Sequence, residues 1–305
     1  MRRMMQIVDA TPDRFDLRIF LEAYSSAVRS FGEEVPPAWV EERIRGISEG
    51  KEFCLGIAHG EELEGILSYS FRDRRGYSFI CWRSDEVDRE GLLLLIREYA
   101  NRSPQGTKLR ISGFHPNVSQ ELMSSVSEGL GFRTRRRFEM VVPLDASVDQ
   151  LEASTQYPTA PITRFDDLTL SRLDWEAYQG TEDSSLLFDS EEDNRKLMKS
   201  LLSGDYGPIL ADASLCILRE GRPGGMIAVT DMGDSSFLAD IAVASDLRRR
   251  GIGKYLLTNA MKMSRRMKKE KMVLWVSEGN MGALSLYRSM GFSVSRTGVF
   301  YLKSE

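Results

Sequence analysis

The alternation of apolar and polar positions predicts short strands and amphipathic helices in a regular order. Residues 7–24 read as a short strand, a polar turn and a helix. The apolar positions of this first helix recur at helical spacing, namely Leu17, Phe20, Leu21, Tyr24 and Val28. Residues 53–58 and 65–71 are apolar runs on either side of a polar turn, which is typical of a β-hairpin.

The same order of elements returns in the second half of the chain. Residues 162–178 again read as strand, turn and helix, and both segments end in Glu-Ala-Tyr. A second hairpin covers residues 215–230, and each half has a Gly-Phe step before its last strand, at Gly131 and at Gly291. These three similarities, the strand–turn–helix segment, the hairpin and the Gly-Phe step, occur in the same order in both halves. They favour an internal duplication over two unrelated α/β domains.

A polar stretch punctuated by prolines separates the two halves. Residues 143–161 carry Pro143, Pro158 and Pro161 among acidic, hydroxyl and amide side chains, a composition typical of a linker. A chain of 305 residues is also long enough for two ordinary domains. We therefore expect one domain over residues 1–150 and a second over residues 151–305.

Composition narrows the class of protein. Hydrophobic residues make up 42% and charged residues 28%, as in folded globular domains. The formal net charge of −4 disfavours a nucleic-acid binder. The cysteines Cys54, Cys81 and Cys216 have neither metal-ligand nor redox spacing, so no metal site is expected. The longest apolar run, residues 92–96, is far too short to span a membrane, and the N-terminal residues do not resemble a signal peptide; we expect a cytoplasmic protein.

One junction between a strand and a helix has the features of an anion-binding site. The apolar strand at residues 237–244 leads into a turn with Gly251 and Gly253, and a helix with one apolar face follows. The first N–H groups of a helix have no intrahelical partners and carry partial positive charge, and glycine lets the backbone approach an anion closely. Phosphate or pyrophosphate is the expected guest, although glycine also occurs in such turns for steric reasons.

Two motifs resemble those of the GNAT superfamily of acyl-CoA N-acyltransferases. Arg248-x-x-Gly251-x-Gly253 resembles the family's Arg/Gln-x-x-Gly-x-Gly/Ala turn, with Ser245 in the place of a common proline. One helix and one strand later the family's second block is matched by Asn280, Ala283, Tyr287, Gly291 and Phe292. The resemblance covers residues 205–305 and, less sharply, 160–204. It implies an α/β (α+β) fold with two GNAT-like domains, each a mixed, mostly antiparallel sheet flanked by helices.

The resemblance implies transfer of an acetyl group from acetyl-CoA to a primary amine by direct attack on the thioester. Tyr287 matches the usual proton donor to the departing thiolate. A backbone N–H of the strand before the turn would polarise the thioester carbonyl. The cofactor-binding positions that the resemblance implies are Ile241, Ala242, Val243, Arg248, Arg249, Arg250, Gly251, Ile252, Gly253, Asn280 and Ala283.

Several assignments stay open from the sequence. Asn280 suits a helix N-cap as well as a cofactor contact, and the arginines at 248–250 also fit a solvated charge run. The general base is not fixed, because the position of the family's glutamate matches Ala239. Strand alternation turns the adjacent Asp240 to the other face, which leaves Glu278 or a chain of waters.

The first half lacks these motifs. Its matching turn, residues 83–91, has no Arg-x-x-Gly-x-Gly, and acidic residues that would repel a pyrophosphate occupy it, namely Asp85, Glu86, Asp88 and Glu90. Ser127 stands where the second half has Tyr287. We expect a degenerate copy that completes the core, forms part of the acceptor site, or pairs with a second subunit in a homodimer.

The leading hypothesis is an N-acetyltransferase whose acceptor is a small-molecule amine or a protein amine, with no nucleic-acid or membrane partner. The alternative is a CoA-binding regulatory module without significant turnover. Tyr287 distinguishes the two, because a module that only binds CoA does not need a proton donor.

Overall fold

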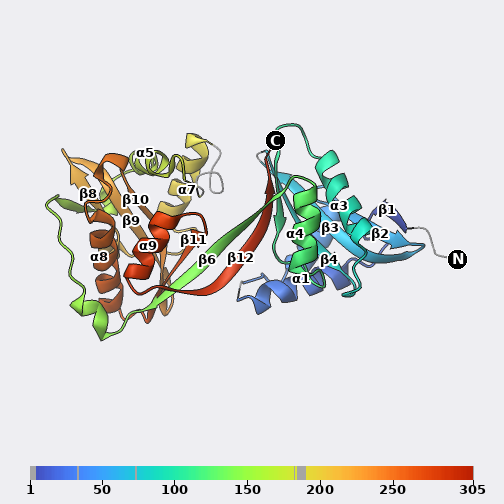
Figure 1. Cartoon of the computed structure of the whole chain (residues 1–305), viewed down its shortest axis with the longest axis horizontal. Coiled ribbons are helices and arrows are strands. Elements are labelled where there is room, and N and C mark those ends of the chain that lie inside the picture. The colour runs from blue at the N-terminus through green and yellow to red at the C-terminus, as the bar shows by residue number, and fades with distance from the viewer. Residues whose placement is uncertain (1–4, 33, 73, 182, 184–189, 305) are drawn as a thin grey trace. The chain divides into compact units, whose positions relative to one another are not determined.

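The computed structural model describes residues 5–32, 34–72, 74–181, 183 and 190–304, which form two compact units (Figure 1). Unit 1 comprises residues 1–136 and 298–305, and unit 2 comprises residues 137–297. Each unit is built around one sheet with helices on both faces. The expected α/β class is confirmed.

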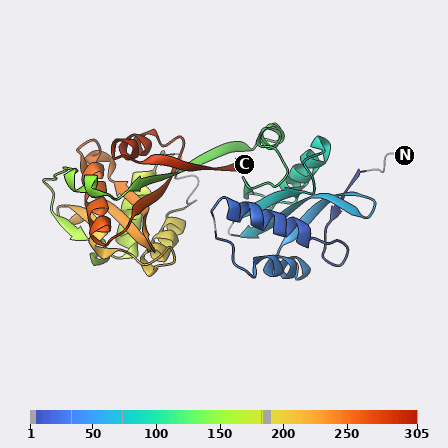
Figure 2. The same cartoon turned by 90° about the horizontal axis from the view of Figure 1, so that it is seen from below.

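Unit 1 has the sheet order β1-β2-β3-β4-β5-β12. Its elements are β1 (Met5–Asp9), α1 (Arg18–Ser30), α2 (Trp39–Ser48), β2 (Phe53–His59), β3 (Glu62–Arg72), β4 (Arg75–Trp82), α3 (Arg89–Asn101), β5 (Lys108–Ser112), α4 (Gln120–Gly129) and the end of β12 (Ser293–Lys303). Only β4 and β5 pair in parallel; the other neighbours are antiparallel. One apolar cluster packs α3 and α4 on the sheet and another packs α1 and α2 on its opposite face (Figure 2).

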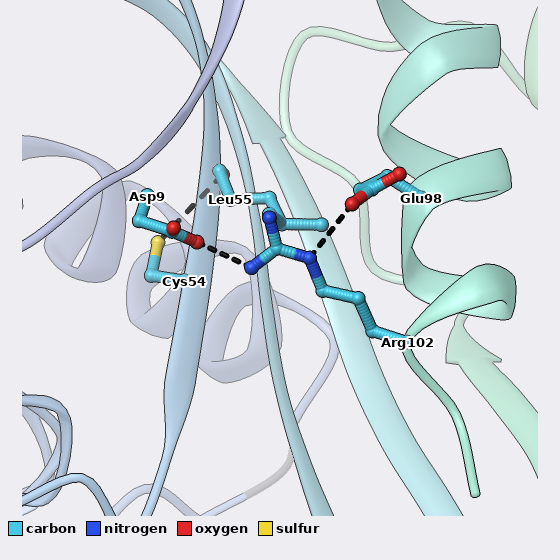
Figure 3. A network of polar contacts seen from close by, with 5 residues as sticks. All are labelled: Asp9, Cys54, Leu55, Glu98 and Arg102. Atoms are coloured by element: carbon cyan, nitrogen blue, oxygen red, sulfur yellow. Dashed lines mark hydrogen bonds and ion pairs between the residues drawn. The ribbon is translucent and has the colours of Figure 1, made fainter.

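A polar network fastens the edge of the unit 1 sheet to α3. Arg102, at the end of α3, donates to the carboxylate of Asp9 on β1 and to Glu98 Oε1 at 2.8 Å (Figure 3). Beside it the buried thiol of Cys54 lies 3.8 Å from the carbonyl oxygen of Leu55, and burial raises the pKa of this thiol. The network therefore joins β1 to the C-terminal end of α3.

Unit 2 repeats the plan, with its part of β12 followed by the order β6-β11-β10-β9-β8-β7. Its elements are β6 (Arg133–Pro143), η1 (Ala146–Gln150), β7 (Thr159–Pro161), η2 (Ile162–Arg164), α5 (Asp167–Tyr178), α7 (Glu191–Ser203), η3 (Ala211–Ala213), β8 (Leu215–Arg219), β9 (Arg222–Met232), β10 (Ser235–Val243), η4 (Ser245–Leu247), α8 (Ile252–Arg266), β11 (Lys271–Ser277) and α9 (Met281–Ser289). Strands β10 and β11 pair in parallel, whereas β6–β11, β9–β10, β8–β9 and β7–β8 are antiparallel. The expected mixed, mostly antiparallel sheet is confirmed.

Two apolar cores cover the faces of the unit 2 sheet. Alternate residues of β9 divide between them, because successive side chains of a strand point to opposite faces. Ile227 and Val229 join the cluster under α8 and α9, and Met226 and Ala228 join the cluster under α5 and α7. All four are fully buried. The candidate active site lies in this unit.

The two halves of the sequence exchange their closing strands. Residues 137–143 of β6 pair with β11 in unit 2, where Met140 is fully buried. Residues 300–303 of β12 pair with β5 in unit 1, where Tyr301 is fully buried and accepts a hydrogen bond from Gln120. The boundary expected near residue 150 lies between β6 and β7, and one strand from each side of it belongs to the other unit.

Equivalent backbone details support the duplication. The hairpins β2–β3 and β8–β9 each contain a register shift, at Ile57/Ala58 and at Ile217/Leu218. The helices α4 and α9 end alike, each with a glycine at positive φ. The phenylalanine after each glycine donates to Ser127 O and to Tyr287 O, at 3.0 Å in both cases, so these two positions are structurally equivalent. No helix of the described residues is both long and apolar enough to cross a bilayer.

Candidate active site

The start of α8 is open to an anion. Its N-cap, Gly251, has φ 78°, a left-handed conformation that glycine adopts readily, and no side chain caps the first turn. A Cβ built on Gly251 would meet nothing within 4 Å. Gly253 serves another purpose, because a Cβ there would lie 3.2 Å from Leu286 Cδ2 on α9. The turn therefore presents unpaired N–H groups with positive partial charge to the space in front of it.

The arginines of this turn have different partners. Arg248 Nε donates to Val243 O at 3.1 Å, and its terminal nitrogen donates to Ala177 O on α5. Arg250 donates to Tyr157 Oη at 3.1 Å, while Arg249 is exposed at φ 63°. Arg248 thus joins the end of β10 to the end of α5, which fixes the wall of the site rather than its anion-binding turn.

Strands β10 and β11 separate beside the turn. They pair only at residues 235–237 with 271–273, although β10 continues to Val243 and β11 to Ser277. Backbone groups of β10 on that side, including those expected at Ile241 and Val243, therefore have no partner strand along the separated stretch. Such a gap suits an extended chain with amide groups, which would pair with the strand as another strand does.

A β-bulge changes which side chains of β10 face this site. Leu238 is paired with Val229 and Asp240 with Ala228, which leaves Ala239 as the extra residue. Ala239 packs in the cluster under α5, and Asp240 Oδ1 accepts a hydrogen bond from Tyr178 Oη of α5 at 3.1 Å. The prediction that alternation turns Asp240 away from the face of Ala239 is wrong, because the bulge places both residues on the α5 side.

Tyr287 of α9 belongs to the apolar cluster that also includes residues of α8, β10 and β11. Its side chain is 5% exposed and packs 5.7 Å from the ring of Phe292. Burial, together with the nearby charges of Asp240 and Asp183, raises the pKa of the phenol, and Arg137 opposes this shift. Tyr287 therefore keeps its proton through the neutral range and can donate it to a stronger base formed during a reaction.

Asn280 has partners within the protein. Its Oδ1 accepts from Ala283 N at 3.2 Å and so caps α9, and its Nδ2 donates to Asp183 Oδ2 at 2.7 Å. The other oxygen of Asp183 accepts from Ser277 at the end of β11. Asp183 is 4% exposed, so this buried carboxylate fixes the end of β11 and the start of α9 beside Tyr287.

Four side chains of the site, Asp174, Tyr178, Asp183 and Asp240, were not predicted from the sequence as functional residues. Asp174 and Tyr178 share one face of α5 at the i, i+4 spacing, a signal that the sequence did contain. Burial raises the pKa of Asp240, and burial together with the charge of Asp240 raises the pKa of Asp174 well above its usual range. Among the described residues no group of three His, Cys, Asp or Glu side chains has the geometry of a metal site.

The equivalent region of unit 1 is filled by its own chain. Asp88 caps α3 by accepting from Glu90 N and Gly91 N, both at 3.2 Å, so a carboxylate already occupies the anion position. Trp82 N donates to Pro116 O at 3.1 Å, and Asn117 Nδ2 donates to Trp82 O at 2.7 Å. These bonds close the space beyond β4.

Two further features of unit 2 are missing from unit 1. Strand β4 pairs with β3 from Arg75 to Trp82 with no bulge, and Ser127 occupies the position of Tyr287. The structure thus gives a physical basis for the expected degenerate copy.

Comparison with known proteins agrees with this geometry. Residues 169–292 match the model of the acetyltransferase (GNAT) family. A GCN5-related N-acetyltransferase from Sphaerobacter thermophilus aligns with a TM-score of 0.59 and 17% identity, over 98% of this chain and 95% of that chain. A tandem GNAT protein from the clavulanic acid biosynthesis pathway aligns with a TM-score of 0.52 and 12% identity, over 99% and 98% of the two chains. The comparison with curated proteins found no match. The tandem GNAT fold predicted from the sequence is confirmed.

Proposed function

Because residues 169–292 carry a domain of the GNAT acetyltransferase family, we propose that this chain transfers an acetyl group from acetyl-CoA to a primary amine. The observation that supports this most directly is the position of three features in one unit. The uncapped start of α8, the separated strands β10 and β11, and the buried Tyr287 contribute residues to one apolar cluster of unit 2. They suit, in that order, a pyrophosphate, an amide-containing arm and a departing thiolate.

The roles of individual residues follow from this arrangement. The turn from Arg248 to Gly253 binds the pyrophosphate through backbone N–H groups. The backbone of Ile241 to Val243 pairs with the amide-containing arm, and an N–H of this stretch polarises the thioester carbonyl. Asp240 accepts a proton from the amine, and Tyr287 donates one to the thiolate.

Asp240 is preferred to Glu278 as the general base. The bulge at Ala239 turns the Asp240 carboxylate toward Tyr178 and Asp174 of α5. Its charge also acts on the phenol of Tyr287. Burial raises the pKa of Asp240, so it binds a proton more tightly than an exposed carboxylate does. Glu278 lies beyond the end of β11 and is exposed.

The test uses the full-length protein with acetyl-CoA and a panel of primary amines comprising 1,4-diaminobutane, glucosamine and a lysine-containing peptide. Thiol release is followed with a chromogenic disulfide, and CoA binding is measured by calorimetry. We expect Tyr287→Phe to lower kcat by about 100-fold while CoA affinity is retained. Tyr206→Phe is the matched control, because Tyr206 is 45% exposed.

The outcomes separate the two candidate functions. Turnover that depends on Tyr287 supports the transferase. Tight CoA binding with equal inertness of the parent and Tyr287→Phe toward every amine would favour a CoA-binding regulatory module. Failure of CoA to bind would overturn both.

A further inference from the structure

The Asp174 carboxyl on α5 is unusual in its burial and in its partners. The residue is 5% exposed, and its Oδ1 has no hydrogen-bond partner among the residues that the structure describes. The Asp240 carboxyl of β10 and the Asn194 amide of α7 lie within hydrogen-bonding reach of this carboxyl group. A buried polar atom without a partner costs free energy, and the cost is largest if the group is charged.

The hydrogen bond between two carboxyl groups requires a proton. An ionised carboxylate has only acceptors, so one member of the pair has to carry an O–H. No described cation forms an ion pair with either group: Arg248, the arginine bonded to α5, donates to the carbonyl oxygens of Val243 and Ala177 instead. Asp174 and Asp240 therefore share one proton and one negative charge.

The groups that face this pair come from every element packed against it. Tyr178 of α5 donates to Asp240 Oδ1, and Asp174 interacts with the neutral amide of Asn194 on α7. The phenol of Tyr287 and the carboxylate of Asp183 also lie within electrostatic range of Tyr178 and its partners. The Asp183 carboxylate opposes a second negative charge on the pair, and the charge of Arg137, which acts on Tyr287, favours it.

We propose that Asp174 and Asp240 act as a proton-sharing carboxyl pair, in which Asp174 is a positioning residue that makes Asp240 a stronger acceptor of the amine proton. This inference rests on the proposed transfer to an amine. Repulsion between two ionised carboxylates at one buried position raises the proton affinity of the doubly ionised pair above that of a single carboxylate. The orphaned Oδ1 of Asp174 fits this role, because that carboxyl is neutral for most of the cycle.

The pair first loses its shared proton to solvent. The doubly ionised pair then takes one proton from the ammonium group of the acceptor, which becomes a neutral amine and attacks the thioester carbon. The C–N bond forms and the C–S bond breaks, and Tyr287 protonates the thiolate. The second proton leaving the nitrogen restores Tyr287, and the pair releases its proton to solvent before the next turnover.

The pair can be tested without any acceptor. Infrared difference spectra of the full-length protein report the C=O stretch of a protonated carboxyl group. We expect this band at neutral pH in the parent, its loss in Asp174→Asn, and a change of its frequency in Asp240→Asn, where burial keeps Asp174 protonated but its carboxylate partner is gone. Glu176→Gln, an exposed acid of the same helix, is the matched control and should keep the band. A parent protein without the band, or a band whose frequency is unchanged by Asp240→Asn, would overturn the shared proton.

The pH dependence of kcat tests the catalytic consequence. An asparagine at 174 carries no charge and can donate to Asp240, so both effects favour ionised Asp240 and lower its pKa. The rising limb of the Asp174→Asn profile should therefore move to lower pH by about one unit, with kcat on the plateau about 10-fold lower and the KM for acetyl-CoA unchanged.

The two levels of inference fail in different ways. A lower kcat with an unshifted limb would show that Asp174 is only structural, even if the protein is an acetyltransferase. If no amine of the panel is acetylated, the proposed function fails and the role in turnover fails with it, while the infrared result still decides whether the proton is shared.

Discussion

Replacing Gly251 with alanine tests the location of the pyrophosphate most directly. The added methyl group would meet no protein atom within 4 Å, so any effect comes from the backbone and from the ligand. Because φ is 78°, an L-residue there costs about 1 kcal/mol of folding free energy. The methyl group would also extend into the space in front of the α8 N-terminus, where the anion is proposed to bind.

The size of the binding effect follows from the hydrogen bonds at stake. A hydrogen bond to a charged group contributes about 1.5–3 kcal/mol. Displacement of the pyrophosphate by one methyl group forfeits at least one such bond, which corresponds to about a 10- to 100-fold increase in the Kd for CoA. Calorimetric titration of the purified protein with CoA measures this change, and denaturant unfolding measures the cost to stability.

Gly233 provides a matched control at the other end of β10. It has φ 71° and, like Gly251, nothing within 4 Å of an added Cβ. The nine residues of β10 place it roughly 30 Å from the turn. Gly233→Ala should lose the same stability and keep the Kd for CoA. Equal CoA affinity in the two variants would refute the placement of the pyrophosphate at the α8 start.

Three other expectations concern unit 1, the exchanged strand β12 and the carboxyl pair of Asp174 and Asp240. Calorimetry should give one CoA per chain, and Asp88→Ala should lower the stability of unit 1 by about 1 kcal/mol without creating a second site, because Asn117 still closes the space beyond β4. Tyr301→Ala should lower the free energy of unfolding of unit 1 by about 3–5 kcal/mol in denaturant titrations and leave that of unit 2 nearly unchanged; a loss confined to unit 2 would contradict the strand exchange. Since burial raises the pKa of Asp174, its contribution to stability is present below the ordinary carboxyl pKa and is lost as pH rises; melting temperatures should therefore fall less between pH 5 and pH 8 in Asp174→Asn than in the parent.

The fold was predictable from local patterns repeated twice along the chain. Apolar periodicity located the helices and hairpins, and the turn at Gly251 and Gly253 identified the open start of α8. Tyr287 was located by its spacing from that turn, and the structure places it in the same unit and in the same apolar cluster as residues of α8, β10 and β11. These features depend on residues that are close in sequence or on motifs with fixed spacing.

The parts that were missed depend on contacts between distant residues. The bulge at Ala239 turns the Asp240 side chain to the opposite face of the sheet from the one that strict alternation predicts. A single extra residue in one strand leaves no mark in the alternation of the flanking apolar positions. Asp174 gains its role only because α5 packs on β10. The partners of the Arg248 side chain, the carbonyl oxygens of Val243 and Ala177, likewise depend on how the turn packs against β10 and α5.

The exchange of strands was not predictable for a different reason. The two closing strands, β6 and β12, follow the same Gly-Phe step, so either could be assigned to either half. The side chains that each strand buries show to which unit it belongs. Met140 of β6 is buried in the core of unit 2, and Tyr301 of β12 is buried in the core of unit 1.

Because of the strand exchange, unit 1 cannot complete its sheet until the end of the chain has been synthesised. A ribosome releases the first 136 residues of unit 1 long before residues 298–305, with about 160 residues in between. At about 5–20 residues per second the nascent N-terminal half waits on the order of ten to thirty seconds for its final strand. During that interval the edge of β5 has no neighbour on one side, which makes it a natural place for a chaperone to bind.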